Sequence, residues 1–319
     1  MMNNGKASRA RKNLQGFTLI EIAMVLVIVG LMLGGIMGAL GPQLEQKKVR
    51  DTQERIKEAS EAIMAFAIAN RRLPCPASGS PGDKGDEQPP DDFGKCPGKG
   101  HGYVPARTLG LGERDPNKGF MQDAWGFGIR YAVTQVPYDG SNDNKCSSDI
   151  LVEKCNNSNS NNYKNNYNST NLPSKCLVSS PCFPFTQPDG IKNAYYNNGR
   201  VVQGEDQPSR EKLLQVCASS TGTIAPTATT PGNCGTVSAN LVVQPAFIVW
   251  STARNGATPR AGISDDEDAN QDGDHVYVSH SRTETSPVAG AKNTAFDDIL
   301  QWRTYLTVFQ DMTKMGILP

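Results

Sequence analysis

Histidine is scarce in this sequence, and the familiar catalytic motifs are missing from it. The 319 residues include three histidines, and none of the eight cysteines lies in a C-x-x-C pair. A zinc site built from the usual cysteine and histidine ligands is therefore disfavoured. The sequence has no Walker A, H-E-x-x-H or G-x-S-x-G motif, and no G-x-G-x-x-G where a strand meets a helix. These absences favour a structural protein over an enzyme.

An excess of either charge is also missing, because 32 basic residues balance 32 acidic ones. The balance is uneven along the chain. The first 16 residues contain four basic side chains and no acid, which leaves 28 basic against 32 acidic residues in the remainder. A mildly acidic body gives no electrostatic reason to expect nucleic acid as a partner.

Charge is almost absent from residues 17–40, where Glu21 is the only charged side chain. As a helix these residues would span about 36 Å, enough to cross a hydrocarbon core of about 30 Å. The basic stretch before them predicts an amino terminus in the cytoplasm. We therefore expect residues 17–41 to form a membrane-crossing helix, with the rest of the chain on the outer side.

All eight cysteines follow this apolar segment. An even number of cysteines on the outer side of a membrane indicates up to four disulfides in an oxidising compartment. A metal cluster or free thiols are the alternatives. We expect pairing between cysteines that are neighbours in the sequence, starting with Cys75–Cys96. The candidates are Cys75, Cys96, Cys146, Cys155, Cys176, Cys182, Cys217 and Cys234.

Three interpretations compete for the apolar segment. A secretory signal has a basic start and a small cleavage residue, for which Ala39 could serve, but its apolar core is shorter and does not open with an acid. A plain membrane anchor accounts for the length but not for Glu21. An acid at bilayer depth costs about 2.5–3.5 kcal/mol on insertion scales, so Glu21 needs a partner. The third interpretation supplies one.

That interpretation rests on a resemblance. The stretch GFTLIE, Gly16–Glu21, follows a short basic leader and resembles the prepilin signal of type IV pilins and type II secretion pseudopilins. The resemblance implies that prepilin peptidase removes residues 1–16 by cutting between Gly16 and Phe17, and then methylates the new amino group of Phe17. Glu21 becomes the fifth residue of the mature chain, where the family carries its acid. It would meet the Phe17 amine of a neighbouring subunit during assembly.

The resemblance also implies a location and partners. The chain would sit in the bacterial inner membrane as a single-pass protein with a cytoplasmic amino terminus, and then move into a periplasmic or cell-surface filament. Its partners would be other pilin or pseudopilin subunits, prepilin peptidase and the inner-membrane assembly platform.

The expected fold is α+β and pilin-like: one long N-terminal α-helix packs on an antiparallel β-sheet with long, disulfide-stapled loops. Residues 17–41 form its apolar membrane half and residues 42–72 its amphipathic outer half. Residues 73–319 form the globular head, with an exposed Asn/Ser-rich insertion at about 139–175. The face of the outer half that covers the sheet is predicted from helical spacing as Ile56, Ala59, Ile63, Phe66, Ala67 and Asn70.

Three segments of the head show strand patterns. Residues 123–136, DAWGFGIRYAVTQV, predict a turn and a strand, and their D-x-W-G is similar to the start of the pseudopilin sheet. Residues 240–256 predict a pair of strands. The final segment, 296–319, predicts a helix or a strand followed by a helix.

An acidic segment, residues 264–279, predicts a calcium site. Asp268, Asn270 and Asp272 alternate before Gly273, as at the opening of an EF-hand loop, although Ser279 stands where that loop ends with Glu. The segment follows the strands predicted at residues 240–256, and pseudopilins, which the N-terminal signal resembles, often bind calcium in the loop after a Ser/Gly-containing strand of this kind. A solvated acidic loop is the alternative. The predicted Ca²⁺ ligands are Asp265, Asp266, Asp268, Asn270, Asp272 and Asp274.

Two other groupings are judged unsuitable for catalysis. His275 and His280 are five positions apart, so on a strand they would face opposite sides. Asp297 and Asp298 are adjacent, so their side chains are expected to diverge. We therefore predict no enzyme.

The function predicted by the resemblance is that of a minor pilin or pseudopilin, at the tip or in another rare position. Removal of the leader leaves 303 residues, and subunits that form the bulk of a filament are typically much smaller. The large tip pseudopilin of secretion systems lacks the acid at the fifth place, so Glu21 favours a pilus subunit or a divergent pseudopilin. The alternative is a membrane-anchored periplasmic enzyme or binding protein.

Overall fold

The computed structural model describes part of the chain, and every structural statement below refers to that part. The predicted insertion at about 139–175, the cleavage-site residues Gly16 and Phe17, and four of the cysteines lie outside it. The side chains of residues 33–40, 99 and 243 also lie outside it. The described ranges are 18–80, 85–90, 96–112, 119–134, 186, 191, 214–225, 232–243, 245–283 and 294–318.

The chain divides into two units, residues 1–48 and 49–319, which we describe separately. In the first unit, helix α1 (Leu19–Asn70) begins, and it continues through Pro42. Within the described residues, no helix combines the length and the apolar character that crossing a membrane requires. The predicted membrane segment, residues 17–41, includes Phe17 and the side chains of 33–40, which lie outside the described set.

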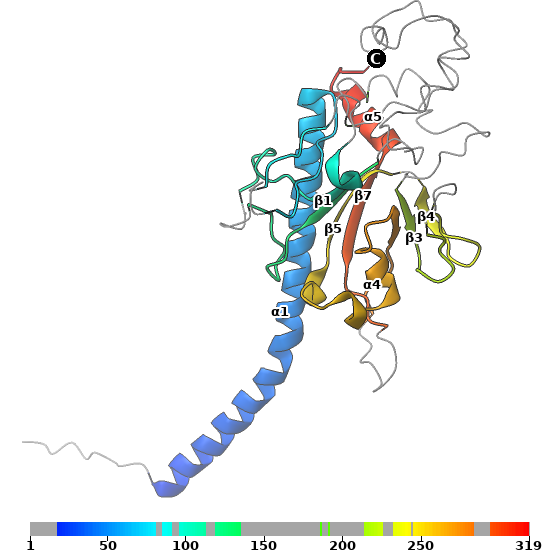
Figure 1. Ribbon diagram of the computed structural model, residues 1–319. Helices are drawn as coiled ribbons and strands as arrows, with labels where there is room; N and C mark the ends of the chain where they lie inside the picture. The colour runs from blue at the N-terminus through cyan, green and yellow to red at the C-terminus, as the bar shows by residue number, and fades with distance from the viewer. Residues whose placement is uncertain are drawn as a thin grey trace, which may run out of the picture. The chain divides into compact units, whose positions relative to one another are not determined.

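The second unit contains two β-sheets (Figure 1). The four-stranded sheet is antiparallel, in the order β1 (His101–Tyr103), β2 (Arg130–Val133), β5 (Pro245–Ser251), β7 (Ile299–Thr304). The three-stranded sheet has the order β4 (Asn240–Val243), β3 (Gln215–Cys217), β6 (Val276–Val278). In it, β3 is antiparallel to β4 and parallel to β6. The helical elements that remain are η1 (Pro97–Gly100), η3 (Ala253–Asn255), η4 (Arg260–Gly262), α4 (Asp265–Ala269) and α5 (Tyr305–Lys314).

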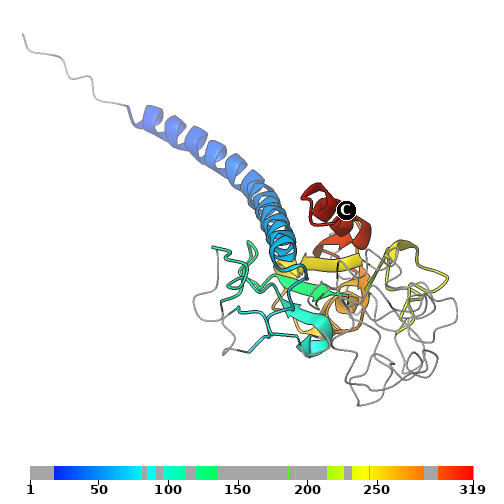
Figure 2. The same ribbon diagram turned by 90° about the horizontal axis from the view of Figure 1, so that it is seen from above.

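One face of the four-stranded sheet is covered by helices. Successive side chains of a strand point to opposite faces, so Phe247 and Val249 of β5 share a face with Tyr131 of β2. Side chains of α1 and α5 pack against them in the largest buried cluster, and Figure 2 shows both helices on this side. The helical members that are most buried are Ile56, Ala59, Ile63, Ala67, Val308 and Met312.

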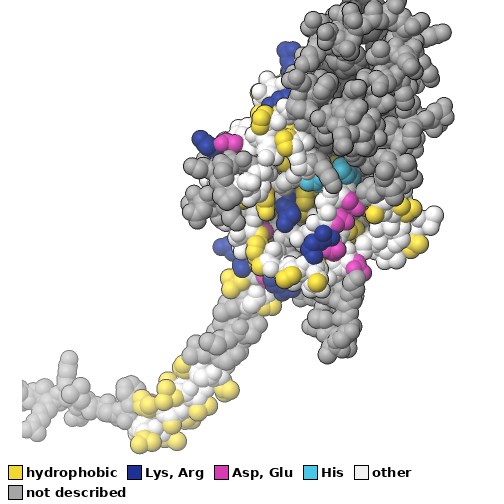
Figure 3. Space-filling view, in the orientation of Figure 1, with side chains coloured by type: hydrophobic (Ala, Val, Ile, Leu, Met, Phe, Trp, Pro, Cys, Tyr) yellow, Lys and Arg dark blue, Asp and Glu magenta, His cyan; other side chains and the backbone are white. Residues whose placement is uncertain are grey.

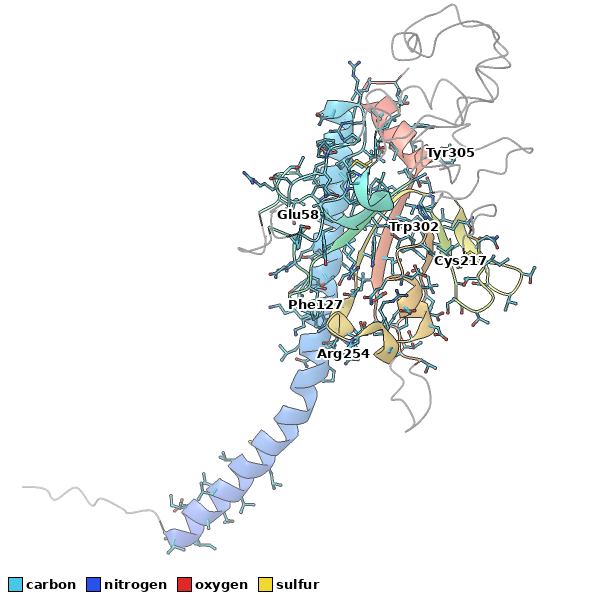
Figure 4. The ribbon with its side chains drawn as sticks, viewed as in Figure 1. Glu58, Phe127, Cys217, Arg254, Trp302 and Tyr305 are labelled. Carbon is cyan, nitrogen blue, oxygen red and sulfur yellow. A yellow bond between two sulfur atoms is a disulfide. The ribbon has the colours of Figure 1, made fainter. Side chains whose placement is uncertain are left out.

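The other face of the same sheet is covered by the three-stranded sheet. Ile248 and Trp250 of β5 form a second buried cluster with Val216 of β3 and Tyr277 of β6. Trp302 of β7, labelled in Figure 4, is half-buried against this cluster. The unit is therefore built in three layers, with the four-stranded sheet in the middle.

The predicted apolar face of the helix is right for four residues and wrong for two. Ile56, Ala59, Ile63 and Ala67 are fully buried. Phe66 is only half-buried and Asn70 is exposed, because the buried stripe runs through Thr52, Ser60 and Met64 instead. Polar Thr52 is buried because its hydroxyl accepts a 3.0 Å hydrogen bond from the Ala124 amide of the turn before β2.

The predicted strands are present, but one predicted pairing between them is wrong. Residues 240–256 do contain two strands, β4 and β5, but these lie in different sheets and do not pair with each other. The prediction of a strand pair is wrong because β2 and β7 occupy the two edges of β5, while β4 pairs with β3 in the other sheet. The final segment forms a strand followed directly by a helix, since Thr304 ends β7 and caps α5 through a 3.2 Å bond from the Thr307 amide.

Two disulfides join cysteines that are neighbours in the sequence, as expected. Cys75 and Cys96 are paired with their Cα atoms 5.4 Å apart, and Cys217 and Cys234 with theirs 5.5 Å apart. They close loops of 21 and 17 residues, each of which corresponds to about 3 kcal/mol in the chain-entropy estimate. The predicted pairing Cys75–Cys96 is confirmed.

Replacement of Ile63 by alanine tests the packing of α1 on the sheet. Ile63→Ala leaves a cavity at a site with 0% exposure, so we expect it to lower the free energy of unfolding by about 2–5 kcal/mol. The matched control is Leu306→Ala on α5, whose side chain is 63% exposed and should cost about 0.5 kcal/mol or less. Urea unfolding followed by circular dichroism measures both, and equal effects would contradict the packing.

Candidate functional site

The amino-terminal end of α1 is an exposed apolar surface with one acid at its start. Thr18 caps the helix, since its hydroxyl accepts a 3.3 Å hydrogen bond from the Glu21 amide. Glu21 therefore lies in the first turn, where the helix dipole favours a negative charge. Figure 3 shows the hydrophobic side chains gathered on this part of the helix. They are Leu19, Ile20, Ile22, Met24, Val25, Leu26, Val27, Ile28, Val29, Leu31 and Met32.

These side chains surround the helix and do not form a stripe along it. The run from Leu26 to Val29 is exposed at every position, although four consecutive residues cover all sides of a helical turn. A helix that is apolar on all sides is stable only inside protein or lipid. This part of α1 is therefore a surface for association, and Glu21 is its one charged side chain among the described residues 18–32.

In the head, a short helix organises the acidic segment. Helix α4 opens with a reciprocal capping box in which Ser264 accepts from the Glu267 amide and Glu267 accepts from the Ser264 amide. This arrangement turns Glu267 inward, and its side chain has 0% exposure. The segment predicted as an EF-hand-like loop thus begins as a helix.

The six predicted calcium ligands take part in separate contacts. Asp268 binds the guanidinium of Arg260 at 2.5 and 3.0 Å, and Asp266 accepts from Ser220 at 2.5 Å and lies 3.0 Å from the ring of His280. Asp265 is an exposed residue at the start of α4. As a set of six, these ligands stay a prediction.

The remaining three predicted ligands shape the chain between α4 and β6. Asp272 accepts from the Asp274 amide at 2.9 Å, and Asp274 accepts from the Val276 amide at 2.7 Å. Gly273 between them has φ +76°, which fits the sharp turn predicted for this glycine. Burial, together with the charge of Asp272, raises the pKa of Asp274 to about 7.

Asn270 joins three parts of the head. Its side-chain oxygen accepts from the Val278 amide at 2.7 Å, and its Nδ2 donates to the Val278 carbonyl at 3.0 Å. The same nitrogen donates to Asp298 Oδ2 at 2.8 Å. This single amide therefore ties α4 to the end of β6 and to the residue before β7.

The expectation that Asp297 and Asp298 diverge is wrong. One oxygen of each lies within 4.8 Å of the other and of a Glu267 oxygen. The rule of alternating sides does not apply because both residues precede β7, which begins at Ile299. Their positions are set by Glu267, which accepts from the Asp297 amide at 2.9 Å, and by Asn270. Sequence reasoning missed Glu267 because the EF-hand pattern assigns it no role.

The two aspartates of this cluster, Asp297 and Asp298, lie in a setting that resists ionisation. Burial, together with the charge of Glu267, raises the pKa of Asp297 to about 7. Burial raises the pKa of Asp298 well above its ordinary value, and the charges of Glu267 and Asp297 add to the shift. In both aspartates burial therefore disfavours the ionised form, which a nearby positive charge would favour.

A second buried acid, Asp123, fastens the turn before β2 to the end of β5. Its Oδ1 accepts from the Trp125 and Phe127 amides, both at 2.9 Å, and its Oδ2 accepts from the Ser251 hydroxyl at 2.5 Å. The D-x-W-G residues therefore have a structural role, which is to hold the turn before β2 against the end of β5. Burial raises the pKa of Asp123, although these hydrogen bonds oppose the shift.

The contacts described for His280 do not form a catalytic triad with a serine. His280 stacks on Phe296 with ring centroids 4.0 Å apart. Its Nε2 lies 3.0 Å from Asp266 Oδ2, and the other oxygen of Asp266 accepts a hydrogen bond from the Ser220 hydroxyl. The acid therefore stands between the serine and the histidine, whereas a catalytic triad needs the histidine in the middle. His275 is buried and lies edge-on to His101.

Comparison with known protein families finds a match at the amino-terminal end of the chain. Residues 11–37 match the family model described as the prokaryotic N-terminal methylation motif. The chain carries the N-terminal signal of type IV pilins and pseudopilins. The matched residues include Gly16, Phe17 and Glu21, and no curated protein or solved structure is similar enough to the chain to be matched.

The prepilin signal carries several implications with it. It supports a pilin or pseudopilin precursor, which prepilin peptidase processes and which assembles with other pilins. It implies membrane anchoring followed by assembly in the periplasm or at the cell surface, and it points to a structural subunit. The α+β fold, with an N-terminal helix followed by antiparallel pairing, is consistent with the pilin-like fold.

Asp123→Asn tests the structural role of Asp123 through pH. Because burial raises the pKa of Asp123, the folded protein keeps this proton to a higher pH than the unfolded chain does. The contribution of this group to stability therefore falls as pH rises above about 4. We expect the melting temperature of the wild type to fall relative to that of Asp123→Asn as the pH rises from about 4 towards neutrality. A difference that stays constant across this range would contradict the assignment.

Proposed function

We propose that this chain is a minor pilin or pseudopilin that enters a type IV pilus or type II secretion pseudopilus through its N-terminal helix. The observation that carries the proposal is the prepilin signal at residues 11–37, joined to an exposed apolar helix with a single acid. The signal directs prepilin peptidase to remove the leader, and the apolar helix anchors the chain and then supplies the surface that packs among neighbours.

The role proposed for Glu21 follows from charge compensation. Among residues 18–32, which the structure describes, Glu21 is the only ionisable side chain. Cleavage after Gly16 creates a cation, the amino group of Phe17, which methylation leaves charged. In a packed bundle of apolar helices, the Phe17 amine of a neighbouring subunit is then the nearest compensating charge that the motif provides. Loss of one member of a buried ion pair strands the other, at a cost of about 3–5 kcal/mol.

The proposed place at the tip rests on the size of the head. Unit 2 spans residues 49–319, and its four-stranded sheet is covered on both faces by further elements. A head of this size meets fewer steric conflicts where helical neighbours surround it on one side only. Initiation of assembly, adhesion and contact with a secreted substrate are the roles that such a position offers.

Processing is tested by expressing the full chain with and without prepilin peptidase. We expect the peptidase to remove 16 residues and to leave an N-methylated Phe17, both of which mass spectrometry of the amino-terminal peptide detects. Gly16→Val should block the cut because the enzyme acts after this glycine. Gly5→Val, a matched change within the leader, should leave cleavage intact. An unshortened chain in the presence of active peptidase would refute the proposal.

Assembly is tested with Glu21→Val in cells that carry the cognate filament system. We expect incorporation into filaments to fall more than tenfold, as loss of one member of a buried ion pair predicts, while membrane levels and head folding stay unchanged. Glu61→Val is the matched control, because Glu61 is exposed on the outer half of the same helix, 3.8 Å from Lys57. Immunoblots of sheared filaments measure incorporation. Normal assembly of Glu21→Val would rule out the proposed pairing.

A further inference from the structure

Three carboxylates are buried together where α4 meets the residues before β7. The side chains of Glu267, Asp297 and Asp298 are 0%, 5% and 7% exposed. One oxygen of each lies within 4.8 Å of an oxygen of the other two. Such proximity is unfavourable for three ionised groups in a site that excludes water.

A separate observation concerns atoms that lack a partner. Asp297 Oδ1 and Asp298 Oδ1 are buried, and neither accepts a hydrogen bond from any described residue. Buried polar atoms in native proteins nearly always have a partner, and each exception needs an explanation. The second oxygens are used: Asp298 Oδ2 accepts from Asn270 at 2.8 Å, and Asp297 Oδ2 faces Arg254 at 3.8 Å. Each aspartate therefore commits one oxygen to the protein and leaves the other available.

The basic groups nearby compensate this cluster only in part. Arg254, carried by η3 and labelled in Figure 4, is 56% exposed, so solvent screens its charge. The charge of Arg282 favours the ionised form of Asp297, and the charge of Arg130 favours that of Asp298. None of these guanidiniums donates a hydrogen bond to either Oδ1 atom. By contrast, Asp268 of the sequence-predicted ligand set is bound by Arg260 through two hydrogen bonds.

The chemistry of the oxygens selects the ligand. Carboxylate oxygens are hard donors, which favour Ca²⁺ or Mg²⁺ over softer metals. The oxygens of the cluster lie within 4.8 Å of one another, a bound that the ligands of either ion meet. Mg²⁺ dehydrates reluctantly and usually keeps several waters, whereas Ca²⁺ accepts protein oxygens in flexible geometry. The burial of all three side chains therefore favours Ca²⁺.

We propose that Glu267, Asp297 and Asp298 form a Ca²⁺ site. The ion takes the two unpartnered Oδ1 atoms and a Glu267 oxygen as ligands. It joins α4 to the start of β7, beside the bonds by which Asn270 holds β6. None of the three residues belongs to the ligand set predicted from the sequence. The proposal is independent of the filament function.

The experiment uses the full chain purified in detergent and stripped of metal with a chelator. Isothermal titration calorimetry with CaCl₂ and with MgCl₂ measures binding, and thermal unfolding by circular dichroism measures stabilisation. We expect one Ca²⁺ bound per chain, Mg²⁺ bound more weakly, and a melting temperature that rises with calcium concentration, because the ion binds only the folded protein.

Two pairs of variants locate the ion. Asp297→Asn and Asp298→Asn should each weaken Ca²⁺ binding at least tenfold and abolish most of the calcium-dependent rise in melting temperature. Without calcium they should melt at or above the wild-type temperature, because an amide adds nothing to the like-charge repulsion within the cluster at any pH. Asp268→Asn and Asp272→Asn, matched changes in the sequence-predicted set, should keep wild-type affinity.

Two results would overturn the proposal. One is a wild-type chain that neither binds Ca²⁺ nor melts at a higher temperature in its presence. The other is binding that Asp268→Asn or Asp272→Asn removes while Asp297→Asn and Asp298→Asn retain it, which would place the ion in the acidic segment instead. The wild-type titration alone decides the first, so the test stands even if a variant fails to fold.

Discussion

Strand β5 is buried on both faces, and the rest of the head depends on that burial. All seven of its residues are buried. Phe247 and Val249 pack under the helices, while Ile248 and Trp250 pack under the second sheet. A strand of this kind needs cover from both sides, so α1, α5 and the three-stranded sheet are each required to keep it from water. Apolar burial on both faces thus holds the central sheet of the head in place, together with the hydrogen bonds of Asp123 at the end of β5.

The acidic side chains of this protein differ in where their compensating groups come from. Some are compensated within the chain and stabilise the fold, and one depends on another molecule. Glu21 is exposed on an apolar helix, where the compensating charge must come from another molecule. Asp123 is enclosed by three donors of its own chain, so it serves only the fold. The cluster around Glu267 lies between these cases, because the chain provides part of its compensation and leaves two oxygens available.

Local patterns in the sequence were enough to recognise the resemblance to a prepilin signal and to predict the long helix, the pairing Cys75–Cys96 and a final segment that is a helix or a strand followed by a helix. Each depends on residues that are close in sequence. The pairing of β5 and the meeting of Glu267 with Asp298 could not be predicted, because they depend on how distant segments pack. Thr52 shows the same limit: a polar residue entered the buried stripe of α1 because the Ala124 amide, 72 positions later, gives its hydroxyl a partner.

The register of β2 against β5 has a consequence for when the head can fold. Val133 lies opposite Phe247, 114 residues further along the chain, and β7 joins the sheet later still. A contact of such high sequence separation forms slowly, since the loop between its ends must close first. As the chain emerges through a membrane from its amino terminus, the Cys75–Cys96 link can close early, while the central sheet must wait for nearly the whole polypeptide. A pilin precursor that is exported in this way would therefore present an incomplete head, whose unpaired strand edges are prone to aggregation until β7 arrives.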